Sequence, residues 1–191
     1  MSVPSPASQS LAALSISSPS EAQPPPASDL RNIRSYPPFY TLQPNLTIRA
    51  RQLELWSSLI TSYCATNHIF RLSLSSPPPD LFSNTTIKRS LKAADIKTVL
   101  ESMGKTIEWL SADKSACLVW WRSAEEWADA LVQWVEGTGQ KGAVLTVYEL
   151  RETGDWRGME EVMLRKVLTL LAKKGKAAIF AVGDGEGVKF F

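Results

Sequence analysis

The sequence predicts an α+β protein, mainly helical, built from two tandem winged-helix domains that each combine helices with a short β-hairpin wing. Two observations lead to this fold class. First, helices followed by a two-stranded hairpin occur twice along the chain, in about 75 residues each time. Second, hydrophobic residues make up 44% of the 191 residues and charged residues 21%, as in globular proteins that bury a core.

Residues 1–35 differ from the rest of the chain because they hold most of its serine and proline clusters and lack periodic apolar residues. We therefore expect a disordered tail. The apolar run at residues 11–16 is too short for a membrane span and has no basic flank, so we expect neither a secretory signal nor a membrane helix. The protein is expected to be soluble.

Residues 36–45 form a proline-aromatic motif between the tail and the first predicted helix. Pro37 and Pro38 fix φ near −65° and disfavour helix in the residue before each, which predicts an extended, polyproline-like segment. Phe39 and Tyr40 are aromatic side chains of the kind that anchor protein interfaces. The candidate partner-binding residues are therefore Pro37, Pro38, Phe39 and Tyr40. An equally open alternative is that the segment folds back to cap its own domain.

Residues 46–121 form the first predicted domain. Apolar spacings of three and four predict one helix before the proline-broken stretch at residues 75–79 and another after it. The apolar positions are Leu53, Trp56, Ile60 and Tyr63 in the first helix and Ile96, Val99, Leu100 and Met103 in the second. After Gly104 the pattern changes to two β-type runs, at residues 106–110 and 117–121, which predict the hairpin.

Residues 122–191 form the second predicted domain. Ser123 and Glu126 give a capping-box signal, followed at helical spacing by Trp127, Leu131 and Trp134. The elements expected next are a strand at residues 143–147, a short helix near Glu149, a helix over residues 160–173, and a hairpin of residues 177–182 and 187–191. The hairpin encloses the turn signal Gly183-Asp184-Gly185. Trp120 and Trp121 fall where the two domains meet and could seal the junction.

Few residues could carry catalysis or bind a metal. Cys64 and Cys117 are the only cysteines and His68 is the only histidine, which is poor material for zinc, disulfides or a Cys/His catalytic pair. We expect two buried packing cysteines and a surface or capping histidine. The carboxylate pairs at residues 125–126 and 160–161 lie at helix starts, where acids stabilise the helix dipole. The sequence thus predicts no enzyme, no cofactor and no metal.

Nucleic-acid binding is the main alternative function, because winged-helix domains often place a helix in the major groove. Residues 46–119 carry nine Lys+Arg and six Asp+Glu, a net charge of +3, while residues 120–191 carry ten and eleven, a net charge of −1. Neither domain is strongly basic, and Asp184 and Glu186 on the last wing would repel phosphate. We therefore expect protein contact rather than direct nucleic-acid recognition.

Four collinear segments resemble a known family. They are Pro37-Pro38-Phe39-Tyr40-Thr41-Leu42-Gln43-Pro44-Asn45, Arg51-Gln52-Leu53-Glu54-Leu55-Trp56, Glu125-Glu126-Trp127 and Gly187-Val188-Lys189-Phe190-Phe191. In this order and spacing they resemble the family of the small subunit of the endosomal ESCRT-II complex. The resemblance runs from about Tyr36 to Phe191 and implies the same tandem winged-helix fold.

The resemblance implies a non-enzymatic scaffold in endosomal sorting of ubiquitinated membrane cargo to multivesicular bodies. It implies a cytoplasmic protein that is recruited to the endosomal membrane with indirect membrane contact. The partners implied are the two larger ESCRT-II subunits, bound through the N-terminal part, and the first ESCRT-III subunit, recruited by the C-terminal winged helix. Two copies per complex are implied as well.

The docking residues that the resemblance carries over are Pro37, Pro38, Phe39 and Tyr40. No short motif in residues 120–191 marks the contacts with ESCRT-III. A WW domain also recognises Pro-Pro-x-Tyr and stays open as a further partner of the same motif.

Overall fold

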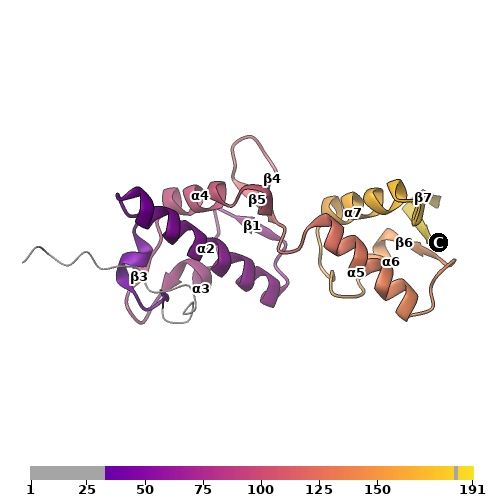
Figure 1. Ribbon diagram of the computed structural model, residues 1–191, viewed down its shortest axis with the longest axis horizontal. Coiled ribbons are helices and arrows are strands. Elements are labelled where there is room, and N and C mark those ends of the chain that lie inside the picture. Colours follow the sequence, from indigo (N-terminus) through magenta and orange to yellow (C-terminus); the bar gives the residue numbers. More distant parts are fainter. Residues whose placement is uncertain (1–32, 183–184) are drawn as a thin grey trace, which may run out of the picture.

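A computed structural model of the chain describes residues 33–182 and 185–191. Two winged-helix domains follow one another along the long axis of the molecule, each with its own hydrophobic core (Figure 1). The predicted fold class is confirmed. Within the described residues, no helix combines the length and the apolar character that a membrane crossing needs.

The first domain is built around the long helix α2 (Leu46–Asn67). Asn45 begins this helix because its side chain accepts hydrogen bonds from the backbone N–H groups of Thr47 and Ile48. His68 ends it in the left-handed conformation, with φ of 51°. His68 is exposed, so its predicted place as a surface or capping residue is confirmed.

The rest of the first domain forms two small sheets and short helices. The elements follow α2 in this order: strand β1 (Arg71–Ser73), helix α3 (Pro79–Phe82), strands β2 (Ser83–Asn84) and β3 (Arg89–Ser90), helix α4 (Ala93–Ser102), the 3-10 turn η2 (Gly104–Thr106), and strands β4 (Ile107–Trp109) and β5 (Ala116–Val119). The antiparallel sheet has the order β1-β5-β4, so the predicted hairpin β4–β5 is confirmed as the wing. The sequence prediction missed β1, α3 and the ribbon β2–β3.

The second domain repeats the arrangement with helix α5 (Ala124–Gly137), strand β6 (Val144–Thr146), helices α6 (Val147–Arg151) and α7 (Glu161–Lys173), and strands β7 (Ala177–Val182) and β8 (Gly185–Phe190). The sheet order is β6-β8-β7, all antiparallel. Ser123 with Glu126 and Thr146 with Glu149 form reciprocal capping boxes at the starts of α5 and α6. The predicted turn at Gly183 and Asp184 lies outside the described residues.

The two cores meet through side chains that cross the domain boundary. Phe70 comes from the first domain, yet it is buried in the core of the second, with its ring 4.0 Å from that of Trp121 between centroids. Trp121 in turn meets Trp127 of α5 edge to face, at 5.9 Å. Lys166 of α7 pairs with Glu108 of β4 across the same junction. The domains are therefore packed against each other, which agrees with the expected sealing role of Trp121.

Candidate protein-docking site

The proline-aromatic motif folds as a single 3-10 turn, η1 (Pro37–Tyr40), and this corrects the prediction of an extended segment over these residues. Tyr36, just before the turn, keeps the extended backbone that a following proline favours. Pro37 and Pro38 occupy the first turn, where a missing N–H breaks no hydrogen bond and a φ near −65° suits a helix. Proline stiffness therefore favours this turn as much as the polyproline conformation.

The aromatic side chains of the motif point into the first domain. Phe39 and Tyr40 are each 2% exposed. Phe39 stacks on Trp56 of α2 with centroids 4.3 Å apart, and Tyr40 meets the same indole edge to face at 5.8 Å. Phe82 stacks on Trp56 at 5.9 Å. The motif thus caps its own domain, which is the second of the two interpretations that the sequence left open.

The side chain of Gln52 forms hydrogen bonds with the backbone of the motif. It is the one buried polar side chain in the described part of the chain, 3% exposed, and lies one helical turn before Trp56. Its amide nitrogen donates to the carbonyls of Phe39 and Thr41, both at 2.9 Å, and its oxygen accepts from the N–H of Gln43 at 3.1 Å. The indole N–H of Trp56 also donates to the Phe39 carbonyl, at 3.1 Å. The sequence analysis missed Gln52; its signal was a glutamine on the apolar face of a predicted helix.

Residues before the motif fix its other side. Ile33 is buried in the first core, and the backbone N–H of Tyr36 donates to its carbonyl at 3.1 Å. The backbone carbonyl of Arg34 accepts from the Tyr40 hydroxyl at 3.1 Å and from the Asn84 side-chain amide at 2.8 Å. The Arg34 guanidinium donates to backbone carbonyls of α3 and β2. Residues 33–35, expected as part of the tail, therefore belong to the folded domain; residues 1–32 lie outside the described residues.

The motif presents a proline surface to solvent. Pro37 and Pro38 are exposed and Tyr36 is half-buried. Beside Pro38, a hollow lined by Ile33, Tyr36, Phe39 and Leu55 holds only ≈ 30 Å³, about the room of one water molecule. Of the four predicted site residues, Phe39 and Tyr40 are therefore buried in the domain, and Pro37 and Pro38 lie on its surface.

Burial of Tyr40 bears on the WW-domain alternative. A WW domain must reach the tyrosine of Pro-Pro-x-Tyr, yet the Tyr40 ring is enclosed and its hydroxyl bonds to the Arg34 carbonyl. In this conformation the motif cannot serve as a WW ligand.

The residues that were weighed for chemistry have structural places. Cys64 and Cys117 are fully buried, as predicted, and burial raises the pKa of both thiols to about 12, which keeps them unreactive. Within residues 33–182 and 185–191, no three His, Cys, Asp or Glu side chains gather as a metal site would require. Glu126 closes the capping box of α5, and Glu161 pairs with Arg165.

In a winged-helix domain that binds nucleic acid, α7 would be the recognition helix and its exposed face would contact the nucleic acid. Two of its cations are already paired, Arg165 with Glu161 and Glu186 at 2.9 Å each, and Lys166 with Glu108. Carboxylates beside these cations would repel phosphates, and the paired cations are not free to bind them. The structure therefore agrees with the charge argument against nucleic-acid recognition.

The second domain has an open groove between the start of α5 and α7. It is lined by Ala124, Glu125, Val162, Arg165, Lys166, Thr169, Leu170 and Lys173, and measures ≈ 510 Å³. Val162, one of the lining residues, is 48% exposed, a large apolar side chain in contact with water. Apolar side chains next to charged ones are the composition of a protein-contact surface.

Comparisons of the sequence with known proteins agree on the same family, and they cover most of the folded chain. The sequence model of the family described as "ESCRT-II complex subunit" matches residues 33–165. The chain is 41% identical over 165 residues to vacuolar protein-sorting-associated protein 25 of Danio rerio, with 82% of this chain and 95% of that protein covered. To the Homo sapiens protein of the same name it is 39% identical over 164 residues, covering 82% and 93%. To that of Arabidopsis thaliana it is 37% identical over 166 residues, covering 82% and 92%.

Solved structures agree with the sequence matches. The fold is similar to the crystal structure of subunit VPS25 of the endosomal trafficking complex ESCRT-II, with a TM-score of 0.73 at 28% identity over 83% of this chain and 97% of that chain. It is also similar to a chain in the crystal structure of endosomal complex ESCRT-II (VPS22/VPS25/VPS36). There the TM-score is 0.72 at 27% identity, covering 85% of this chain and 100% of that chain.

Proposed function

The chain belongs to the family of vacuolar protein-sorting-associated protein 25, a subunit of the ESCRT-II complex, and from this membership we propose that it is a non-enzymatic scaffold in endosomal sorting. It docks on the two larger ESCRT-II subunits through its first domain, in two copies per complex. In this role it is cytoplasmic and recruited to the endosomal membrane, where the complex sorts ubiquitinated cargo to multivesicular bodies.

One observation carries the docking proposal: without any partner present, the motif is already folded and packed onto its own domain. Phe39 and Tyr40 lock the turn onto Trp56, and Gln52 bonds its carbonyls, so Pro37 and Pro38 stand on a fixed backbone. A preorganised surface loses little conformational entropy on binding, which leaves more of the contact energy for affinity. Pro37 and Pro38 are then the contact residues, and Phe39 and Tyr40 position them.

The second domain supplies the other interface. We assign to it the recruitment of the first ESCRT-III subunit, and the groove around Val162 is the surface that best fits a protein partner. The packed junction of Phe70, Trp121 and Trp127 supports this division, because it holds the two surfaces at a fixed spacing.

Co-expression with the two larger ESCRT-II subunits tests the assembly. Native mass spectrometry of the purified complex should give the mass of one copy of each larger subunit and two copies of this chain. If the complex purified after co-expression lacks this chain, although the chain is present in the same cells and folded, the proposal is contradicted.

A further inference from the structure

The sheet of the second domain has one face that packs on its helices and one that does not. Direct partners in an antiparallel sheet share a face, and alternate residues of a strand share a face. Val144 pairs with Lys189, which pairs with Ala178, and Phe180 pairs with Gly187. On the opposite face Val188 and Phe190 are fully buried. The side chains of Val144, Ala178, Phe180 and Lys189 therefore form the outer sheet face.

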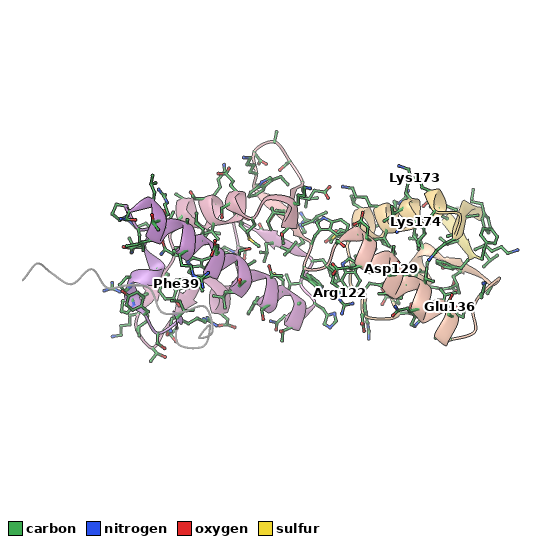
Figure 2. The ribbon with its side chains drawn as sticks, viewed as in Figure 1. Phe39, Arg122, Asp129, Glu136, Lys173 and Lys174 are labelled. Carbon is green, nitrogen blue, oxygen red and sulfur yellow. The ribbon has the colours of Figure 1, made fainter. Side chains whose placement is uncertain are left out.

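The next row of the strands extends this outer sheet face. The backbone N–H of Phe191 donates to the Lys176 carbonyl at 3.0 Å, which places these two residues side by side. The ammonium of Lys189 lies 6.0 Å from the centre of the Phe191 ring, so both side chains are on the same side. Figure 2 shows Lys173 and Lys174 at the end of α7 that leads into this row.

The outer sheet face combines exposed apolar groups with positive charge. Phe191 is 57% exposed, Val144 50% and Phe180 39%. Lys174 and Lys176 are exposed and Lys189 is half-buried. None of these three lysines has an ion-pair partner within the described part of the chain, whereas Arg165 and Lys166 of the same domain do.

The positive charge of the outer sheet face contrasts with the net charge of the whole second domain. Residues 120–191 have a net charge of −1, from ten Lys+Arg and eleven Asp+Glu. The described strand residues of the outer sheet face include no Asp or Glu, and the Glu149 carboxylate accepts from the Thr146 hydroxyl at its edge, at 2.9 Å. Helix α5, by contrast, carries Glu125, Glu126, Asp129 and Glu136. Figure 2 shows Asp129 and Glu136 along α5, apart from Lys173 and Lys174. One surface of a slightly acidic domain is therefore positive.

We propose that the outer sheet face, with Lys174 beside it, is a contact surface for an anionic lipid bilayer. The surface of a sheet is broad rather than grooved, and so it suits a membrane plane better than a bound peptide. Aromatic side chains enter the headgroup region, and lysines lie along the surface with their ammonium groups among lipid phosphates and carboxylates. This contact goes beyond the docking function and does not depend on it.

Co-sedimentation of the full chain with vesicles tests the surface. The probes are vesicles of phosphatidylcholine with about a third phosphatidylserine and vesicles of phosphatidylcholine alone, at low and at physiological salt. The chain should sediment with the anionic vesicles and not with the neutral ones. Binding should weaken as salt rises, because salt screens the lysine charges.

Two sets of variants locate the contact. Replacing Lys174, Lys176 and Lys189 by Gln should weaken binding about a hundredfold, since each lysine near an anionic surface contributes a factor of about five. The control triple variant Lys92→Gln, Lys97→Gln and Lys105→Gln removes the same charge from the first domain and should bind as the wild type does. Phe191→Ala should weaken binding about tenfold, and Leu110→Ala, an exposed apolar residue of the first wing, should not.

Circular dichroism should show unchanged melting for all these surface variants. Equal loss in the two triple variants would overturn the proposal, because net charge rather than this surface would then drive binding. Absence of binding to anionic vesicles at low salt would overturn it as well. Binding of an acidic peptide such as oligoglutamate, without vesicle binding, would assign the surface to a protein partner instead.

Discussion

The ring of Phe39 lies parallel to the indole of Trp56, with centroids 4.3 Å apart and planes 7° apart. This contact joins a motif that precedes the first domain to the central helix of that domain. It divides the four motif residues into two buried aromatics and two exposed prolines. Stability and docking therefore depend on different residues of the same short segment.

The first prediction concerns stability. Phe39→Ala should lower the free energy of unfolding by about 3–5 kcal/mol, because it removes a buried ring and leaves a cavity against Trp56. Chemical denaturation measures the change. Leu46→Ala, a control at a side chain that is 78% exposed, should change it by less than about 0.5 kcal/mol. An unchanged denaturation midpoint in Phe39→Ala would show that the motif does not pack as described.

The second prediction isolates Gln52. Gln52→Leu keeps similar volume but removes the partner of the Gln43 N–H and one of the two donors to the Thr41 carbonyl, the other being the Gln43 side chain. Leaving the part-buried Gln43 N–H without a partner should lower the free energy of unfolding by about 1 kcal/mol or more. Gln133→Leu on the exposed side of α5 is the control. If both variants unfold at the same denaturant concentration as the wild type, Gln52 does not hold the turn.

The third prediction concerns the junction between the domains. Phe70 is 3% exposed and packs in the second core although it follows the first helix. Phe70→Ala should cost about 3–5 kcal/mol and should speed amide hydrogen exchange in α5 and α7, beyond its own domain. Phe180→Ala, on an exposed ring of β7, is the control. Faster exchange confined to α2 and α4 would mean that the domains are not coupled through Phe70.

The sequence predicted the helices and wings well because their apolar spacing is regular. Ile96, Val99 and Leu100, for example, are spaced for one face of α4, and all three are buried. Elements without such spacing were missed: α3 is one turn long, and β1 has three residues whose pairing with β5 depends on contacts far along the chain.

The residues next to the motif also could not predict that its aromatic side chains point into the first domain. Pro37 and Pro38 permit both a polyproline segment and a 3-10 turn. The choice depends on Trp56 and Gln52, which lie more than ten residues later and offer a stacking surface and hydrogen-bond donors. Folding back was one of two open interpretations for this reason.

The fourth prediction is a pH dependence of stability. Backbone hydrogen bonds from Ser123 and Thr146 lower the pKa of Glu126 and Glu149 below the usual glutamate value of 4.5. A carboxylate whose pKa is lowered by folding stabilises the protein above the unfolded-state pKa, and that contribution is lost as pH falls through the folded-state pKa. The free energy of unfolding should therefore decrease below pH 4.5.

Urea denaturation between about pH 3 and pH 7 measures this dependence. The double variant Glu126→Gln and Glu149→Gln should show a shallower decrease, because Gln can keep the capping bond without titrating. Glu136→Gln, an exposed site near the end of α5, is the matched control. A decrease of the same steepness in the double variant and the wild type would show that the capping boxes do not contribute.

Titration of the purified chain against the complex of the two larger ESCRT-II subunits tests the docking claim most directly. The double variant Pro37→Ala and Pro38→Ala should bind at least tenfold more weakly than the wild type, while its melting temperature changes little, because the two side chains are exposed and make the contact. Pro44→Ala, an exposed proline just beyond the turn, should bind like the wild type. Equal affinity of the double variant and the wild type would contradict docking through the prolines.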